Sequence, residues 1–340
     1  MRHISRWDLD KTYLRTEFDT VRDLVRTAFE RPDEKRTHPG AATLLREMSR
    51  AGVSIHILSG SPEQMRRRLE DKLRLDGIAW DSFTLKPNLQ NMLRLRFRAL
   101  RDQLGYKLPA LLDARTALLA RSDDYQGAKE TLFGDDAEAD AFVYSLYADI
   151  MAGRVGEELV HTIGIRGRVY EDVLEDMKRC VRLVKGAEVV ERILIHLEQQ
   201  SAPRDFQVYG PRVVPFYNYL QAAFVVHEDG RLPAEGVLRV AVELVTQHRF
   251  DGDALARSYA DLGKRGHLMG TKVGELETAL DAWEKERKAP AHDELHAMVE
   301  RLPGYAAQAR ERYQTGIDVP MPDYLALVEK HNPRHKKKKG

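Results

Sequence analysis

The first 150 residues of the chain alternate short apolar stretches with longer amphipathic ones. Runs rich in β-branched residues predict strands, and apolar residues at helical spacing predict helices between them. We expect strands over residues 4–9, 53–58, 81–85 and 128–133, and helices over residues 18–29, 40–51, 63–75, 88–104 and 108–119. Strands that alternate with helices favour an α/β fold, in which helices cover both faces of a parallel, Rossmann-like sheet.

Helical periodicity dominates after residue 152. We expect helices over residues 170–184, 189–199, 213–226, 234–246, 253–262 and 273–288, and only weak strands over residues 159–165 and 206–209. The sequence therefore predicts an α/β domain over residues 1–151 and a mostly α-helical region of unknown role over residues 152–330. Residues 331–340 are rich in lysine and predict a basic, disordered tail, with a contact to nucleic acid or another acidic surface as the weaker alternative.

Polar residues follow three of the predicted strands. Asp8 and Asp10 are two residues apart, so on an extended strand both carboxylates point to the same side. Ser59 and Gly60 place a hydroxyl in a glycine-containing loop after the second strand. The last strand is followed by a group of acidic residues, namely Asp135, Asp136, Glu138 and Asp140. Ligands of such sheets bind beyond the carboxyl ends of the strands, so we expect these groups to meet in one site.

Carboxylates that gather in one place repel one another, and a hard cation such as Mg²⁺ relieves that repulsion. A carboxylate cluster that holds Mg²⁺, with a hydroxyl and a lysine nearby, suits phosphoryl transfer, because there the protein mainly positions groups and neutralises charge. The alternative is that Asp8 and Asp10 form a solvated turn, and that residues 134–140 are an acidic loop before a helix N-cap. All three groups occur in this order, each after a strand-like run, which favours the site.

These residues resemble the motifs of the haloacid dehalogenase (HAD) superfamily of phosphatases. The sequence D-L-D-K-T at residues 8–12 is similar to its D-x-D-x-T motif, and Ser59 to the serine or threonine that follows a strand. Over roughly residues 4–150 the chain is most similar to the phosphatidate phosphatase catalytic domain family of actin-patch proteins and its bacterial relatives. It shares the S-G-S-P loop at residues 59–62 and an acidic G-D-x4-D loop followed by Tyr144. Lys11 stands where that family commonly has a third acidic residue.

The resemblance implies a catalytic role for two of the aspartates. Asp8 would attack the phosphorus atom and form an aspartyl-phosphate, and Asp10 would act first as general acid and then as general base. The ligands of Mg²⁺ would be Asp8, the backbone carbonyl of Asp10 and Asp135, with Asp136 or Asp140 in support.

The resemblance also implies which residues bind the substrate. Ser59 and Gly60 would contact the phosphoryl oxygens, and Thr12 would steady the loop. The phosphate-binding lysine is either Lys107 or Lys86. We favour Lys107, because it begins the helix that leads to the acidic strand, where the family usually has its lysine.

The chain between Thr12 and Ser59, and between Ser59 and Lys107, is too short for a folded cap domain. Cap insertions give HAD enzymes much of their substrate choice, so we expect an open site for a bulky phosphomonoester, such as phosphatidate. One alternative is a small-metabolite phosphatase with the helical region as its lid. Another is a binding or scaffold protein with a degenerate HAD core, against which the presence of both Asp8 and Asp10 counts.

The composition adds few constraints. The 340 residues include 54 basic and 53 acidic ones, a net charge of +1 that does not point to nucleic acid as a partner. Apolar runs fall well short of the ~20 residues that a membrane-spanning helix needs, and the start lacks the apolar region of a signal peptide. The lone cysteine, Cys180, has no partner for an internal disulfide. We expect a cytoplasmic protein with a phosphorylated lipid or small molecule as substrate, and peripheral membrane contact is compatible with this.

Overall fold

The strands form one parallel sheet in the part of the chain that the computed structural model describes, which comprises residues 2–15, 36–86, 100–184, 186–287, 292–309 and 319–331. The order across the sheet is β3-β2-β1-β4-β5-β6. The bounds are His3–Asp8 for β1, Ser54–Pro62 for β2, Ser82–Lys86 for β3, Lys129–Asp135 for β4, Val190–His196 for β5 and Val213–Phe216 for β6. All neighbouring strands are parallel, so their carboxyl ends lie at one edge. The predicted α/β fold with a parallel sheet is confirmed.

Strand β1 lies in the middle of the sheet, between β2 and β4. All of its residues are buried, as expected for a central strand with helices on both faces. At its carboxyl end, Asp8 is in register with Leu58 of β2, and Trp7 is in register with Phe133 of β4. The residue that the motif singles out therefore stands at the centre of the sheet's carboxyl edge.

Two segments predicted as helices begin with strands. Residues 189–199 contain β5, and the predicted helix over residues 213–226 begins with β6 before helix α8 (Tyr219–Glu228). These predictions are wrong because a strand buried on both faces is continuously apolar, as at Ile193–Leu194–Ile195, and has no period that separates it from a buried helix. The weak strand predictions are also wrong, since residues 159–165 belong to helix α6 and residues 206–209 to a 3₁₀ helix. The sheet thus crosses the boundary predicted near residue 152.

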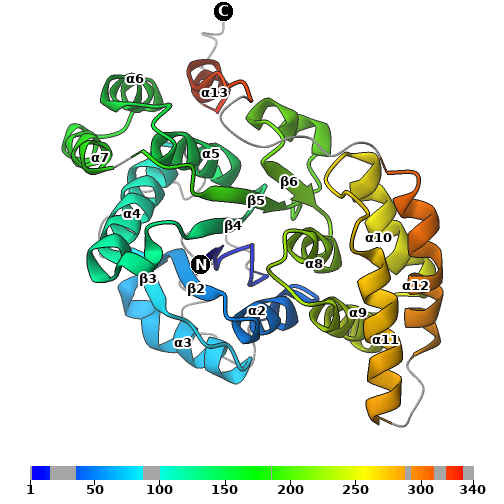
Figure 1. Ribbon diagram of the computed structural model, residues 1–340. Coiled ribbons are helices and arrows are strands. Elements are labelled where there is room, and N and C mark those ends of the chain that lie inside the picture. Colours follow the sequence, from blue (N-terminus) through cyan, green and yellow to red (C-terminus); the bar gives the residue numbers. More distant parts are fainter. Residues whose placement is uncertain are drawn as a thin grey trace, which may run out of the picture.

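Helices cover both faces of the sheet (Figure 1). One face carries α4 (Leu100–Arg121) and α5 (Asp140–Met151), with α6 (Glu157–Gly167), α7 (Glu171–Leu183) and α13 (Tyr324–His331) packed against them. The other carries α2 (Ala41–Arg50), α3 (Arg66–Leu75) and α8, and beyond them α9 (Ala234–His248), α10 (Gly252–Lys264), α11 (Val273–Arg287) and α12 (Asp293–Ala306). Short 3₁₀ helices are η1 (Glu63–Met65), η3 (Asp123–Tyr125) and η4 (Pro203–Tyr209). The predicted helix over residues 18–29, most of that over residues 88–104, and the tail from residue 332 lie outside the described residues.

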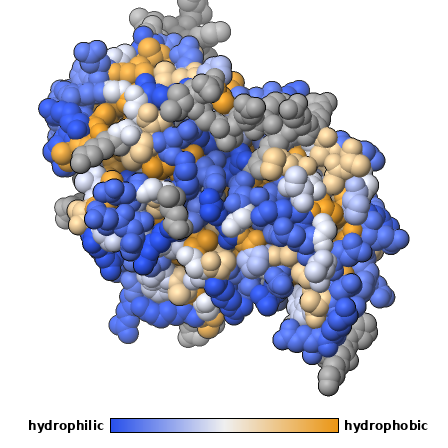
Figure 2. Space-filling model, viewed as in Figure 1, coloured by the Kyte–Doolittle hydropathy of each residue, from blue (hydrophilic) through white to orange (hydrophobic). Residues whose placement is uncertain are grey.

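Two large apolar clusters hold these layers together. The first starts at the sheet, where Trp7 and Phe133 stack with ring centroids 3.8 Å apart, and continues through α8 to α12. The helices after β6 therefore share a core with the sheet. In Figure 2 hydrophilic residues cover most of the visible face, and apolar ones gather near α6 and α7, where Ile165 and Leu183 are 52% and 55% exposed. Among the described helices, none combines the length and apolarity that a bilayer crossing requires.

Candidate active site

Asp8 ends the central strand and lies inside the protein, with only 1% of its surface exposed. Neither of its carboxylate oxygens has a hydrogen-bond partner among the described residues. The Nζ atom of Lys107 lies 3.3 Å from Asp8 Oδ2, as an ion pair. Buried polar atoms are almost always hydrogen-bonded in folded proteins, so a buried carboxylate with no hydrogen bond to either oxygen indicates a site for a ligand or an ion.

Asp135 and Asp140 complete a group of three buried carboxylates with Asp8. One oxygen from each lies within 4.8 Å of the others. Asp135 ends β4 and is held by the backbone amides of Ala137 and Glu138, which donate to its Oδ1 at 2.7 and 3.0 Å. Asp140 is the first residue of α5 and accepts a hydrogen bond from the Asp135 amide at 3.1 Å. The structure thus brings together three of the five predicted metal ligands through their side chains.

Gly134 explains how β4 and α5 approach so closely. A Cβ atom at this position would lie 2.5 Å from Asp140 Oδ2 and 2.6 Å from Asp140 Cβ, closer than real contacts allow. The glycine that precedes Asp135 is therefore required by the packing of Asp140. The G-D pair of the acidic motif has a physical basis here, since the glycine makes room for the third carboxylate.

Lys107 is the lysine of this site. It projects from α4, is fully buried, and donates from Nζ to Asp140 Oδ1 and, at 2.9 Å, to Glu138 Oε2. Lys86, the alternative, ends β3 and places its Nζ 5.6 Å from the ring centroid of Tyr106. Lys107 contacts Asp8 and Asp140 directly, so the geometry favours it over Lys86.

The group carries more negative charge than Lys107 can neutralise. Burial is the largest cause that raises the pKa of the Asp8, Asp135 and Asp140 carboxyls above the ordinary range. Repulsion from neighbouring carboxylates adds to it, with Glu138 contributing to all three. Burial lowers the pKa of Lys107, but the attraction of Asp140 and Asp8 outweighs it, and the pKa lies well above its ordinary value. Three buried carboxylates, of which Asp8 has no hydrogen bond to either oxygen among the described residues, fit a hard divalent cation such as Mg²⁺, which prefers oxygen ligands.

Asp10 does not belong to the three-carboxylate group through its side chain. Its Oδ2 accepts hydrogen bonds from the hydroxyls of Ser59 and Ser61, at 2.8 and 2.9 Å. A tight turn follows Asp10, in which Lys11 has a positive φ of 60°. The side chain of Asp10 is therefore not part of the three-carboxylate group, and its backbone carbonyl stays the predicted metal ligand.

Ser59 and Gly60 lie at the end of β2 beside Asp10. The Ser59 hydroxyl also accepts a hydrogen bond from the Ser61 amide at 3.0 Å, so its orientation is fixed. A Cβ atom added to Gly60 would have no neighbour within 4 Å among the described atoms, which marks open space next to the loop. Thr12 donates to Asp135 Oδ2 at 3.2 Å and thereby ties the turn to the acidic loop.

The side chain of Asp136 does not lie with the clustered carboxylates, although it is predicted to support the metal site. Its two carboxylate oxygens accept hydrogen bonds from the backbone amides of Gln199 and Ser201, at 2.7 and 2.9 Å. The side chain therefore fixes the loop after β5, and it is not among the described carboxylates that cluster with Asp8. Adjacent residues of a loop after a strand point in different directions, which the sequence alone does not reveal.

Two contacts near the site are not evident from the sequence, although Glu138 is one of the acidic residues that follow β4. Glu138 contacts Lys107, and Tyr219 of α8 donates a hydrogen bond to the backbone carbonyl of Thr12. Tyr219 is fully buried and also stacks near Trp7, with ring centroids 6.1 Å apart. It lies 207 residues from Thr12 in the sequence, so only the fold brings the two together.

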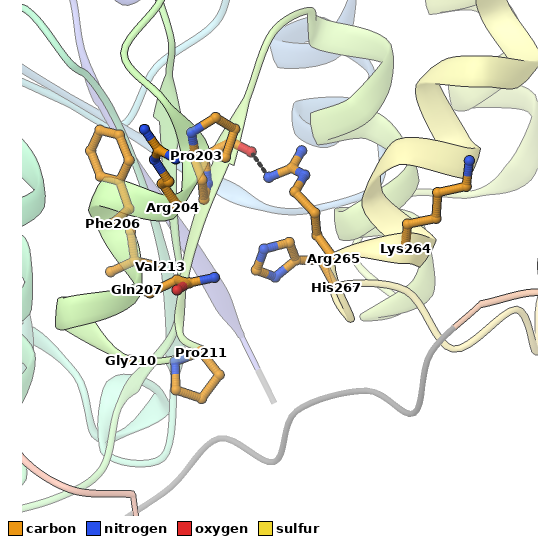
Figure 3. Close-up of a pocket in the computed structure, with 11 residues that line it drawn as sticks. Pro203, Arg204, Phe206, Gln207, Gly210, Pro211, Val213, Lys264, Arg265 and His267 are labelled. Atoms are coloured by element: carbon orange, nitrogen blue, oxygen red, sulfur yellow. Dashed lines mark hydrogen bonds between the residues drawn. The ribbon is translucent and has the colours of Figure 1, made fainter.

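A separate cavity of about 380 Å³ lies between η4, β6 and α10 (Figure 3). Its lining includes Arg204, Lys264 and Arg265, but no member of the three-carboxylate group. The Arg265 guanidinium donates to the Pro215 carbonyl at 2.7 Å, as the dashed line in Figure 3 shows. Arg265 is therefore engaged in holding α10 to the sheet edge.

Comparison of the chain with family models, with curated proteins and with solved structures finds no match. The fold and the geometry of the site are therefore the basis on which a function is argued.

Proposed function

We propose that this protein is a Mg²⁺-dependent phosphomonoester hydrolase of the HAD type, which acts through an aspartyl-phosphate on Asp8. The observation that carries the proposal is the state of Asp8. This carboxylate ends the central strand, is buried without a hydrogen-bond partner among the described residues, and faces Asp135, Asp140 and Lys107. A carboxylate that only capped a turn would be solvated or bonded to backbone amides.

The metal would be held by Asp8, Asp135 and Asp140 and by the backbone carbonyl of Asp10. When bound, Mg²⁺ would supply positive charge to the carboxylates and to the phosphoryl group. The donor set consists of oxygens alone, as this ion prefers.

In the covalent step, the nucleophile must be oriented by its neighbours while one of its oxygens stays accessible to the phosphorus atom. An oxygen of Asp8 forms a bond to phosphorus while the bond from phosphorus to the leaving oxygen breaks. Lys107, 3.3 Å away, orients Asp8 and offsets its charge in the buried site. Ser59 provides a hydroxyl next to the reacting group on the open side at Gly60.

Asp10 is the proton donor and acceptor in this proposal. The hydroxyls of Ser59 and Ser61 fix its carboxyl group, which would give its proton to the leaving oxygen. After departure, the same carboxylate would take a proton from the water that attacks the aspartyl-phosphate. The two aspartates of the motif thus have different environments, which suits different roles.

The short connections between the motif residues support a proposal for the substrate class. They leave no length for a folded cap, so we propose a bulky phosphomonoester, with a phospholipid such as phosphatidate as the first class to test. The helices from α8 to α12 share an apolar core with one face of the sheet. This packing gives no specific support to the alternative in which these helices form a lid over the site of a small-metabolite phosphatase.

Phosphate release from an aryl phosphate with and without Mg²⁺ tests the proposal. The wild-type protein should release phosphate only with the metal, and Asp8→Asn should abolish release. Asp136→Asn is the matched control, because this carboxylate lies in the same loop but contacts the backbone of residues 199 and 201. A folded wild-type protein with no Mg²⁺-dependent release from aryl phosphate or phosphatidate would contradict the proposal and favour a scaffold.

A further inference from the structure

A second group of potential ligands lies beside the candidate active site and contains two histidines. His196 ends β5 and is in register with Asp135 of β4. His38 precedes α2, and Glu198 follows His196 by two residues. His38 and His196 are 3% and 5% exposed, whereas the side chain of Glu198 is 36% exposed and opens the group to solvent.

The three side chains are spaced as ligands of one ion. One ligand atom from each lies within 4.8 Å of the others, and His38 Nε2 is 3.6 Å from Glu198 Oε2. Two ligands ~2.1 Å from a tetrahedral ion are about 3.4 Å apart, so this pair needs little movement. The two imidazole rings lie with centroids 4.4 Å apart, in an edge arrangement that does not stack them face to face.

Each imidazole has one buried nitrogen without a hydrogen-bond partner among the described residues. His38 Nε2 and His196 Nδ1 are buried and have no hydrogen-bond partner among the described residues. The backbone of Lys11 faces both rings, and that of Tyr217 also faces His196, where these backbone groups oppose the lowering of the imidazole pKa by burial. Metal-binding histidines usually donate one ring N–H to a carbonyl and present the other nitrogen to the ion. Simple core packing would not need an unpartnered nitrogen on each of two adjacent rings.

We propose that His38, His196 and Glu198 form a second metal site, for a divalent transition metal such as Zn²⁺. Two imidazole nitrogens and one carboxylate suit that class of ion, whereas the all-oxygen group at Asp8 suits Mg²⁺. Three protein ligands leave a coordination position for water or a further ligand. Metal binding at this site goes beyond the proposed function and does not depend on it; only the effect of the ion on the turn rests on the proposed function.

The second site is connected to the catalytic turn through Lys11. This residue lies between Asp10 and Thr12, and its backbone faces both imidazoles. An ion that fixes the two rings also fixes the turn, whose positive φ at Lys11 is an uncommon backbone conformation for a side-chain-bearing residue. The ion would thus position the turn without contacting the substrate.

The test is Zn²⁺ binding by untagged, metal-free protein in excess Mg²⁺, measured as metal retained per chain and by the visible spectrum of the Co²⁺ form. We expect one tightly held equivalent in the wild type and in Asp135→Asn, which changes a carboxylate of the three-carboxylate group and none of the three proposed Zn²⁺ ligands. His38→Gln and His196→Gln should each weaken binding at least ~10-fold and remove the Co²⁺ spectrum. Glu198→Gln, at a partly exposed position, removes a ligand without disturbing the core.

A matched control exists at His227. This buried histidine also has an unpartnered Nε2 and a glutamate, Glu275, 3.8 Å away, but it belongs to no described group of three ligands. His227→Gln should bind Zn²⁺ as the wild type does. The proposal is overturned if the wild type retains no Zn²⁺, or if Asp135→Asn loses Zn²⁺ while the histidine variants, including folded Glu198→Gln, retain it. If the wild type retains no Zn²⁺, the rings form only an aromatic cluster with Tyr219 and Phe216.

Discussion

Lys107 Nζ lies 3.3 Å from Asp8 Oδ2, and both side chains are buried. The ammonium also contacts Asp140 and Glu138, so one positive charge serves several carboxylates. A buried ion pair contributes little net stability, but removal of one partner leaves the other charge uncompensated. We therefore expect the stability of a protein without Lys107 to depend on whether a cation is bound to the carboxylates.

Lys107→Met should destabilise the metal-free protein strongly. Removal of one partner of a buried ion pair costs about 3–5 kcal/mol, and Mg²⁺ should recover part of this because it replaces the lost positive charge. Urea unfolding with and without Mg²⁺ measures both effects. Lys86→Met is the control, and a Lys107→Met protein as stable as this control without metal would contradict the arrangement.

Gly134→Ala should displace Asp140. The added Cβ atom would meet Asp140 Oδ2 at 2.5 Å, and forced overpacking typically costs about 1–3 kcal/mol. Calorimetric titration with Mg²⁺ should show weaker binding, since Asp140 is one of the three clustered carboxylates. For stability, Gly60→Ala is the matched control, because its Cβ atom would meet nothing within 4 Å among the described atoms. Equal stability and equal Mg²⁺ affinity in the two variants would refute this interpretation.

The buried ion-pair network at the opposite end of β1 should govern acid sensitivity. Glu130 accepts two hydrogen bonds from Arg6, at 2.8 and 3.0 Å, and one each from Arg115 and Tyr147. Burial alone would raise the pKa of Glu130, but Arg6 and Arg115 outweigh it and lower the pKa from 4.5 to about 2.

Folded Glu130 therefore binds fewer protons than unfolded Glu130 between these two pKa values. Its contribution to stability is complete above pH ~4.5 and is lost as the pH falls to ~2, a loss on the order of 3 kcal/mol. Glu130→Gln should be less stable at neutral pH, because Arg6 and Arg115 lose their partner, and its stability should fall less steeply with acid. Urea unfolding at several pH values measures the slopes, and equal slopes would contradict the assignment.

The sequence predicts most of the site because the site follows strand ends. Asp8, Ser59 and Asp135 each come after a strand-like run, and parallel strands bring such positions to one edge. Lys107 emerges only from the resemblance to a known family, since no periodicity marks a lysine inside a helix as buried. The sequence does not reveal the turned-away side chain of Asp136 or the contact of Tyr219 with Thr12, because both depend on chain that is distant in sequence.

The sequence pattern reads β5 and the start of β6 as helices, because strands buried on both faces are continuously apolar. The run at Ile193–Leu194–Ile195 is buried on both faces, so its pattern lacks alternation. Because β5 is read as a helix, the sequence does not place His196 at the carboxyl end of a strand. It therefore does not predict that His196 and His38 lie together. The β-branched residues of this run were the available signal.

Asp10→Asn should separate the two chemical steps. The variant keeps Asp8 and the three-carboxylate group but cannot donate or accept a proton. Alkyl phosphates, which need protonation of the leaving oxygen, should lose ~10²–10⁴-fold in the first step. Aryl phosphates should react in a fast burst and then stall, because the water that clears the intermediate is not activated. Rapid-quench kinetics on both substrates measure this, and equal mild losses for both would mean that Asp10 only holds its loop.

The most direct test of the account is the location of the phosphoryl group during turnover. Wild-type protein and Asp10→Asn are mixed with an aryl phosphate and Mg²⁺, quenched in acid, digested and analysed by mass spectrometry. We expect a phosphoryl group on the peptide that contains Asp8, more abundant in Asp10→Asn and absent from Asp8→Asn. Steady turnover by the wild type with no phosphoryl group on Asp8 in either protein, or turnover by Asp8→Asn at the wild-type rate, would contradict this expectation.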